Sequence, residues 1–298
     1  MKGIILHGGH GTRLRPLTHT GPKQLLKIAN KPMSQYALED LRDAGITDIA
    51  IIIGDVYPEK VKEFYDDGTK FGVKITYVFQ DQPKGIAHAI GLCRDFIADD
   101  KFVVYLGDNI LRTGLSSYVK NFEISSNDAQ ILLVEVENPS QFGVVEMKEN
   151  KIIKIIEKPK IPPSNLAVIG VYFLTPKIFD VIKKLKPSWR KELEITEALQ
   201  LLMDSGLDIH HDYVTGWWKD TGTPKDILHA NQLILESLKN QENGIFIGDN
   251  CIISSDAKIM GPVIIGDNCT VGSTTVLGPN VSIGKNSHLK NCNIKNSI

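Results

Sequence analysis

The sequence predicts an α/β protein, in which a doubly wound, mainly parallel sheet is followed by a short left-handed parallel β-helix. Two patterns in the chain of 298 residues lead to this fold class. Over the first 240 residues, short apolar runs alternate with helical patterns, as in a doubly wound sheet. From Ile247 onward, an aliphatic residue returns every six residues, which indicates hexapeptide repeats. We therefore predict one domain over residues 1–240 and a second over residues 245–298.

The first part of the chain supplies alternating strands and helices. Apolar runs predict strands at Lys2–Leu6, Asp48–Ile53, Val73–Phe79 and Phe102–Leu106. Between them, helices are predicted near Met33–Ala44, Pro58–Asp66 and Gly85–Ile97. Gly45 follows the first of these helices, where a glycine commonly ends a helix in the left-handed conformation.

The next segment is richer in strands. They are predicted at Ile131–Glu137, Val144–Met147, Ile152–Glu157 and Val168–Leu174. The last helices are predicted at Glu192–Ser205 and Pro224–Leu238, the second with Thr223 as its N-cap. We interpret Gln241–Gly244 as the linker to the repeats.

Eight consecutive aliphatic residues share one phase of the six-residue repeat. They are Ile247, Ile253, Ile259, Ile265, Val271, Leu277, Ile283 and Leu289, and the next position in this phase is Lys295. Each aliphatic side chain should point into a triangular prism, where its burial contributes about 1.5–3 kcal/mol. Cys251 and Cys269 lie 18 residues apart, one full coil. We expect two stacked thiols there, not a disulfide.

The composition excludes several classes of function. The 34 Lys and Arg residues against 35 Asp and Glu give a net charge of −1, which offers no electrostatic basis for binding nucleic acid or a membrane surface. No apolar run approaches the roughly 20 residues of a membrane span, and the N-terminus has no signal-peptide pattern. The four cysteines fit neither a disulfide scaffold nor a zinc site. We therefore expect a cytoplasmic protein.

A glycine-rich loop, His7–Pro16, follows the first predicted strand. It matches neither the P-loop nor the dinucleotide fingerprint, because no Gly-Lys-Ser/Thr closes it and Leu14 replaces the third glycine. Its glycines nevertheless allow backbone N–H groups to approach a phosphate closely. Arg13, Arg15 and Lys23 add positive charge nearby, so we predict phosphate binding here.

Two aspartates are candidates for holding Mg²⁺. Asp108 follows the apolar run Phe102–Leu106, at the carboxyl end of a strand where α/β sheets bind ligands. Asp220 lies just before the helix that begins at Pro224. Mg²⁺ is usually bound by one or two carboxylates together with substrate phosphates, which two such aspartates would provide.

These motifs resemble those of the sugar-1-phosphate nucleotidyltransferases, most closely the glucose-1-phosphate thymidylyltransferases. The matching segments are His7–Thr18, Pro22–Leu26, Lys31–Met33, Leu106–Ile110, Phe142–Glu146, Glu157–Pro159, Glu192–Thr196 and Trp218–Thr223. They cover roughly residues 1–240 in the family's order, and members of this superfamily often carry a C-terminal hexapeptide β-helix. The resemblance implies a Rossmann-like nucleotidyltransferase domain.

The resemblance also implies a reaction and a role for each matching residue. Nucleoside monophosphate would pass from dTTP to glucose 1-phosphate with Mg²⁺ as cofactor, giving dTDP-glucose and pyrophosphate. Nucleotide-binding roles fall on Gly8, Gly9, Gly11, Thr12, Arg13, Gln24, Gln80 and Gly85. Sugar-phosphate roles fall on Gly143, Glu157, Lys158, Gly170, Tyr172, Arg190 and Trp218. Catalytic roles fall on Arg13, Lys23, Asp108 and Lys158, and metal binding on Asp108 and Asp220.

Several questions stay open on the sequence alone. His7 stands where the family usually has Ala, and it either contacts the base or ribose or packs beside the loop, whereas His10 is expected to be solvated. Gln24 favours dTTP, with UTP as the alternative. A noncatalytic subunit is disfavoured because the cations and metal carboxylates are kept. An acetyltransferase activity in the β-helix would have only His288 as a base. The expected partners are the nucleoside triphosphate, a hexose 1-phosphate and further copies of the chain in a homo-oligomer.

Overall fold

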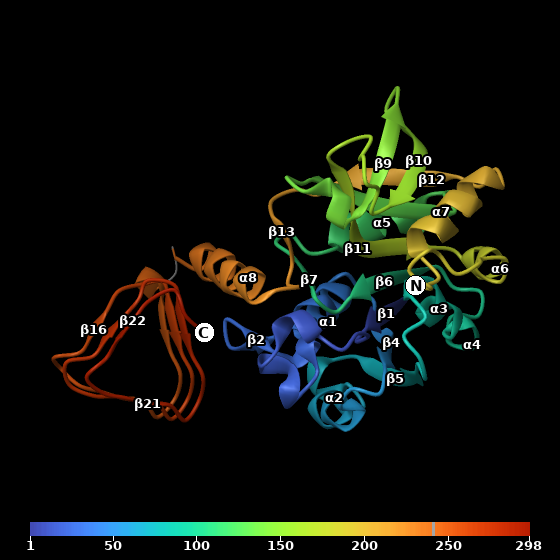
Figure 1. Ribbon diagram of the computed structural model, residues 1–298. Coiled ribbons are helices and arrows are strands. Elements are labelled where there is room, and N and C mark those ends of the chain that lie inside the picture. The colour runs from blue at the N-terminus through green and yellow to red at the C-terminus, as the bar shows by residue number, and fades with distance from the viewer. Residues whose placement is uncertain (240–241) are drawn as a thin grey trace. The chain divides into compact units, whose positions relative to one another are not determined.

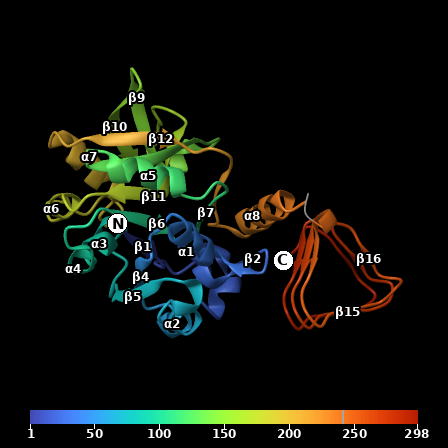
Figure 2. The same cartoon turned by 180° about the vertical axis from the view of Figure 1, so that it is seen from behind.

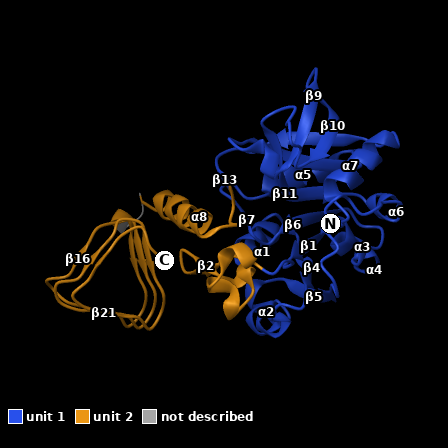
Figure 3. Cartoon of the chain, in the orientation of Figure 1, with its two compact units in different colours: residues 1–10, 34–218 blue, residues 11–33, 219–298 orange. Residues whose placement is uncertain are grey.

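The structure is a computed structural model that describes residues 1–239 and 242–298. It divides into two compact units, which are described separately below (Figure 3). Unit 1 comprises residues 1–10 and 34–218, and unit 2 comprises residues 11–33 and 219–298. Residue 240 and Gln241, which fall at the predicted domain boundary and linker, lie outside the described residues. Among the described residues, no helix is long and apolar enough to cross a membrane.

Unit 1 is built on a sheet whose first half is parallel (Figure 1). The strands β5 (Lys74–Phe79), β4 (Asp48–Ile53), β1 (Lys2–Leu6) and β6 (Phe102–Leu106) lie side by side in that order. All three pairings between them are parallel. These four strands lie within one residue of the predicted bounds, because each is a short, mainly apolar run; β1, β4 and β6 are mostly buried, whereas β5 at the sheet edge is partly exposed.

The second half of the sheet is mainly antiparallel. β6 pairs with β11 (Leu166–Leu174), and β11 pairs with β8 (Ala129–Glu135) and β9 (Gly143–Lys148). β9 forms a hairpin with β10 (Lys151–Glu157), whose turn residues Glu149 and Asn150 both have positive φ. β12 (Ile209–Tyr213) pairs in parallel with β8 at an edge. The predicted α/β fold class is confirmed, and its parallel strands are followed by a mixed region.

Helices cover this sheet. They are α1 (Met33–Asp43), α2 (Pro58–Tyr65), α3 (Ile86–Gly91), α4 (Arg94–Ile97), α5 (Ser116–Ile124), α6 (Ile178–Ile182) and α7 (Ile195–Asp204). Alternate residues of β1, Ile4 and Leu6, join one core cluster with residues of α3, α6 and α7. The single helix predicted at Gly85–Ile97 is two helices, α3 and α4. Gly91 ends the first of them, in keeping with the low helix propensity of glycine.

Two predicted caps are present. Gly45 has φ of 87°, its N–H bonds the carbonyl of Arg42, and Ile46 N bonds Leu41 O, which together form a Schellman motif after α1. In unit 2, Thr223 is the N-cap of α8 (Pro224–Ser237), and its hydroxyl accepts a hydrogen bond of 3.2 Å from Asp226 N.

Unit 2 joins α8 to a short hairpin and to the β-helix. The hairpin pairs β2 (Lys27–Ile28) with β3 (Lys31–Pro32). Asn231 of α8 is buried, and its Oδ1 accepts hydrogen bonds from Ala29 N at 2.9 Å and from Ser282 Oγ at 2.7 Å. One asparagine therefore links the helix, the hairpin and the β-helix.

The β-helix has three sides, each a three-stranded parallel sheet (Figures 1 and 2). One side contains β14 (Ile245–Ile247), β17 (Val263–Ile265) and β20 (Val281–Ile283). The second contains β15 (Ile252–Ile253), β18 (Thr270–Val271) and β21 (His288–Leu289). The third contains β16 (Lys258–Ile259), β19 (Val276–Leu277) and β22 (Asn293–Ile294). The predicted repeat fold is confirmed.

The last repeat differs from the predicted spacing. Ile294, not Lys295, pairs with Leu277, so the final turn is one residue shorter than six. The shorter turn keeps an aliphatic side chain in the interior column, where a lysine would have to bury its charge. Cys251 and Cys269 are free thiols, as predicted, and their sulfurs contact the carbonyls of Gly266 and Gly284 at 3.2 and 3.1 Å.

Candidate active site

The glycine-rich loop begins directly at the end of β1. His7 is 5% exposed, and its ring lies edge-on against Tyr65 with the ring centroids 5.7 Å apart. Tyr65 in turn hydrogen-bonds Ser34 at 2.7 Å. His7 thus packs against Tyr65 at the start of the loop, in keeping with the second of the two expected roles. His10 is exposed, as predicted, with Asp55 3.6 Å away.

Gln80 lies beside this loop, just after β5. A Cβ atom added to Gly8 would be 3.7 Å from Gln80 Oε1. On the other side of the amide, Gln80 Nε2 lies 2.9 Å from His88 Nδ1 and 3.5 Å from the Gly85 carbonyl oxygen. The fold thus brings together three predicted nucleotide-binding residues, Gly8 after β1 and Gln80 and Gly85 in the connection between β5 and α3.

Gly85 is also the point where this region meets the segment that contains Arg190. It has φ of 103°, and an added Cβ atom would lie 2.5 Å from the Leu193 carbonyl oxygen. Leu193 N donates to Lys84 O at 2.7 Å, and Ala87 N donates to Leu193 O at 3.1 Å. Only glycine allows the backbone at Leu193 to approach so closely.

The predicted sugar-phosphate residues of this segment form a charged cluster around Glu157. Arg190 Nη1 lies 3.3 Å from Glu157 Oε1 and 3.3 Å from Glu194 Oε1. Thr196 donates a hydrogen bond of 3.0 Å to Glu157 Oε2. Burial, followed by the charge of Glu194, raises the pKa of Glu157, whereas Lys158, Thr196 and Arg190 act to lower it. The Glu157 carboxylate therefore lies within ion-pair distance of two cationic side chains, Lys158 and Arg190.

Lys158 is held in an unusual backbone conformation. Its φ of 41° lies in the left-handed region, which costs a non-glycine residue about 1–2 kcal/mol. Its N–H bonds the Phe142 carbonyl at 3.0 Å, and its Nζ lies 3.7 Å from Glu157 Oε1. Strain of this kind persists where the surrounding structure fixes a residue, and such positions cluster at functional sites.

Asn109 connects several predicted site residues. It is 3% exposed at the start of β7 (Asn109–Leu111), and its Nδ2 donates to Asp108 Oδ1 at 3.0 Å. Its Oδ1 accepts from Trp218 Nε1 at 2.7 Å and from Gly170 N at 3.2 Å. The predicted metal carboxylate is thus joined through one amide to two predicted sugar-phosphate residues.

Close packing explains the two glycines of this region. A Cβ atom at Gly170 would lie 2.7 Å from Leu106 Cδ1, and one at Gly143 would collide with Thr196.

Tyr172 is buried nearby on β11. Burial, then the charges of Glu157, Asp108 and Glu194, raise its pKa far above the ordinary value, so its phenol stays neutral.

Gly9 lies in unit 1 with φ of 93°, and unit 2 holds the other predicted residues, Gly11, Thr12, Arg13, Lys23, Gln24 and Asp220. Gly11 has φ of 60° before the 3₁₀ turn Thr12–Leu14, and its carbonyl accepts a 2.9 Å hydrogen bond from Thr18 Oγ1. An added Cβ atom at Gly222 would lie 3.1 Å from Arg13 Nη2 and 3.4 Å from Asp220 Oδ2, so both side chains flank this glycine. Lys23 begins the 3₁₀ turn Lys23–Leu25, and Gln24 is 1% exposed.

The chain matches a family described as nucleotidyl transferase over residues 2–237. It belongs to the nucleotidyl transferase family. Residues 244–279 match a second family, bacterial transferase hexapeptide (six repeats), in agreement with the β-helix.

Relatives of this nucleotidyl transferase match along most of the chain. The low-salt glycan biosynthesis nucleotidyltransferase Agl11 of Haloferax volcanii is 50% identical over 264 residues, which are 88% of this chain and 72% of that protein. A glucose-1-phosphate thymidylyltransferase of Streptomyces antibioticus is 43% identical over 275 residues, 88% of this chain and 77% of that protein. A crystal structure of UDP-glucose pyrophosphorylase with UDP-glucose is 29% identical with a TM-score of 0.72, covering 79% of this chain and 98% of that chain.

Some residues of the candidate site were not predicted individually. Asn109 lies in the motif Leu106–Ile110, and Glu194 and Thr196 lie in Glu192–Thr196, so the motifs marked their segments without assigning roles. His88 lies in the helix predicted at Gly85–Ile97, and no pattern in the sequence pairs it with Gln80.

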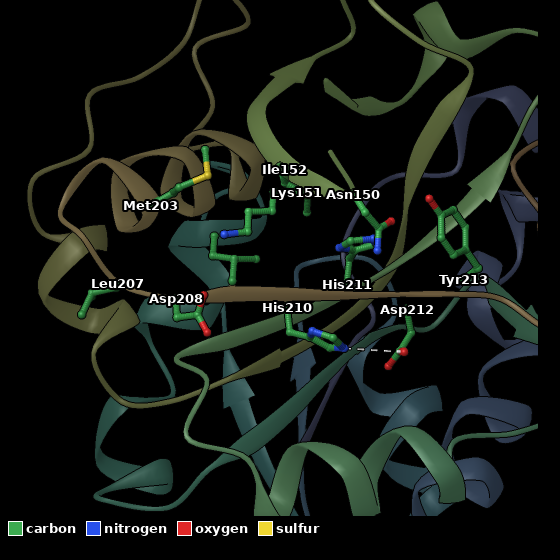
Figure 4. Close-up of a pocket in the computed structure, with 11 residues that line it drawn as sticks. Asn150, Lys151, Ile152, Met203, Leu207, Asp208, His210, His211, Asp212 and Tyr213 are labelled. Carbon is green, nitrogen blue, oxygen red and sulfur yellow. Dashed lines mark ion pairs between the residues drawn. The ribbon is translucent and has the colours of Figure 1, made fainter. Parts of the chain in front are cut away.

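A pocket of 640 Å³ lies elsewhere in unit 1, beside β12 (Figure 4). Its lining comes from the β9–β10 turn, the end of α7 and β12, and includes none of the predicted site residues. His210 and Asp212 point to one side of β12 and form an ion pair at 3.7 Å, while His211 and Tyr213 point to the other. We therefore keep this pocket separate from the candidate active site.

Proposed function

We propose that this nucleotidyl transferase transfers a thymidylyl group from dTTP to glucose 1-phosphate, with Mg²⁺, to give dTDP-glucose and pyrophosphate. The cluster of Glu157, Lys158 and Arg190 carries the proposal, because it offers a carboxylate for sugar hydroxyls next to cations for a phosphate. The relative from Streptomyces antibioticus, named for this activity, supports the same assignment.

The chemistry requires little beyond positioning and charge. A phosphate oxygen of the sugar phosphate attacks the α-phosphorus of the nucleotide, a new P–O bond forms, and the bond to the β-phosphate breaks as pyrophosphate leaves. A phosphate monoester has its second pKa at about 6, so it is already ionised and needs no general base. The difficulty is to bring two anions together, which Arg13, Lys23 and Lys158 would ease by neutralising phosphate charge.

Asp108 and Asp220 would hold the Mg²⁺. Both offer hard carboxylate oxygens, the ligand type that Mg²⁺ prefers, and substrate phosphates and water would supply the other ligands. Bound Mg²⁺ would neutralise charge on the phosphates during transfer. For its part, Asn109 donates to Asp108 Oδ1 and so fixes the orientation of that carboxylate.

UTP is the second candidate nucleotide. The structural relative named UDP-glucose pyrophosphorylase favours it, whereas Gln24 after Lys23 favours dTTP. An added acetyltransferase activity would depend on His288, which lies exposed on β21. Turnover of acetyl-CoA with an amino-sugar phosphate would reveal that activity.

A matrix of nucleotides against sugar phosphates, with pyrophosphate release as the readout, tests the proposal. We expect dTTP with glucose 1-phosphate to give the highest kcat/KM in the presence of Mg²⁺. Asp108→Ala should remove most of this activity. The proposal is wrong if no pair in the matrix releases pyrophosphate, and the metal assignment is wrong if Asp108→Ala is fully active.

The neighbours Lys158 and Lys160 provide a matched pair of variants. Lys158→Ala should raise KM for the sugar phosphate about 10- to 100-fold, the range expected for a charged hydrogen bond of about 1.5–3 kcal/mol. Lys160 is exposed after the motif, and Lys160→Ala should leave KM unchanged. Equal effects of the two substitutions would contradict the role of Lys158.

A further inference from the structure

The amide of Gln80 has a defined orientation because acceptors surround its nitrogen. The Gly85 carbonyl oxygen can only accept a hydrogen bond, and it lies 3.5 Å from Gln80 Nε2. His88 Nδ1 lies 2.9 Å from the same nitrogen. The NH₂ group therefore belongs on this side, and His88 accepts at Nδ1 while its proton resides on Nε2.

A neutral imidazole suits this role. Burial, followed by the charge of Lys84, lowers the pKa of His88, and Asp81 acts in the opposite direction. Gly85 precedes α3 as its N-cap residue, and the carbonyl of Gly85 also accepts from Ala89 N at 3.2 Å. Gln80 is thus anchored to the first turn of α3 through both a side chain and the backbone.

This anchoring leaves the carbonyl oxygen of the amide on the opposite side. Gln80 Oε1 is the atom nearest to the Cβ position of Gly8, at 3.7 Å. Gln80 is also 7% exposed, so its amide cannot rotate freely into water. The glycine-rich loop therefore faces a fixed acceptor. A base with an imide N–H, thymine or uracil, can donate to such an acceptor, whereas N3 of cytosine is itself an acceptor and would oppose it.

We propose that His88 is a positioning residue for base selection, which holds the Gln80 amide so that Oε1 faces the glycine loop and favours thymine or uracil over cytosine. The proposal rests on the proposed function in one respect, namely that the loop binds a nucleoside triphosphate. It adds a residue outside the predicted set, which acts through Gln80 and does not touch the substrate.

Two substitutions of His88 distinguish the effect of its acceptor atom, Nδ1, from the effect of its side-chain volume. His88→Asn keeps an acceptor oxygen near the position of Nδ1, and His88→Leu removes the acceptor at similar size. With glucose 1-phosphate saturating, we expect His88→Leu to raise KM for dTTP about tenfold, as for the loss of one hydrogen bond of about 1–1.5 kcal/mol. The preference for dTTP over dCTP should fall by a similar factor. His88→Asn should stay near wild type, with kcat and KM for the sugar phosphate unchanged in both variants.

A double-mutant cycle with Gln80→Ala distinguishes an effect of His88 through Gln80 from a purely structural effect. If His88 acts through Gln80, His88→Leu should have no further effect on KM for dTTP once Gln80 is alanine. Additive effects would overturn the proposal, as would an unchanged ratio of dTTP to dCTP in His88→Leu. So would a loss in His88→Asn equal to that in His88→Leu. His88→Ala serves as a second acceptor-free variant if His88→Leu does not fold.

Calorimetric binding of dTTP and dCTP distinguishes this proposal from the proposed function. A wild-type protein that binds dTTP but releases no pyrophosphate would contradict the proposed reaction. The effects of His88→Leu and His88→Asn would then be compared through the Kd values for dTTP and dCTP. A wild-type protein that binds neither nucleotide would overturn the inference about His88.

Discussion

At the scale of single residues, the side-chain amide of Asn109 forms hydrogen bonds with Asp108, Gly170 and Trp218. Asn109→Ala would remove the acceptor of Trp218 Nε1 and of the buried Gly170 N, and the donor that Asn109 offers to Asp108 Oδ1. We expect kcat/KM to fall about 10- to 100-fold, as for groups that orient metal ligands. The free energy of unfolding should fall by about 1–3 kcal/mol.

Activity assays and urea unfolding measure the two effects. Asn165→Ala is the matched control, because Asn165 is exposed before β11 and its side chain has no such role. A variant at Asn109 with wild-type kcat/KM would show that this network does not position Asp108.

The raised pKa of Glu157 predicts that the stability of the folded protein depends on pH. Its pKa is raised in the folded protein above the ordinary value of 4.5, so the folded state binds more protons than the unfolded state in the window just above pH 4.5. Stability linked to this group is therefore present below that window and is lost as pH rises through the folded pKa.

Glu157→Gln removes this titration. Urea unfolding at a series of pH values should show wild type losing stability relative to Glu157→Gln as pH rises from 4.5. Parallel pH profiles for the two proteins would contradict the prediction.

At the scale of elements, the β-helix offers a comparison between two glycines at the same repeat position. A Cβ atom at Gly266 would lie 2.7 Å from Lys285 N in the next coil, whereas nothing lies within 4 Å of that position at Gly284. We expect Gly266→Ala to cost about 1–3 kcal/mol through overpacking. Gly284→Ala should be neutral or stabilising by up to about 1 kcal/mol. Thermal unfolding distinguishes the two, and equal melting temperatures would argue against this account.

The elements also show what local patterns can predict. The four parallel strands and α1 were predicted within one residue, because apolar strands and a capped helix carry their signals in a short window. α5, α6 and β12 were not predicted. β12 is a short edge strand with the sequence Ile-His-His-Asp-Tyr, and it forms because β8 provides a partner.

At the scale of the whole molecule, unit 2 depends on Asn231. Asn231→Ala would leave the Ala29 N–H and the Ser282 hydroxyl without their buried acceptor. We expect a loss of about 1–3 kcal/mol in the unfolding of unit 2. Gln232→Ala, at the partly exposed neighbour that bonds Glu236, should change stability by less than about 0.5 kcal/mol. Chemical unfolding of both variants checks this, and equal losses would contradict the linking role of Asn231.

The sequence by itself determined the α/β class, the hexapeptide repeat, the helix caps at Gly45 and Thr223, and the motifs of the family. Each depends on residues close together in the chain, where apolar spacing and turn chemistry act locally. Only the tertiary structure decided that His7 packs on Tyr65, that His88 orients Gln80, and that Ile294 replaces Lys295 in the interior column. These outcomes depend on which distant segments meet, because burial and hydrogen bonding are settled by partners that the local sequence does not contain.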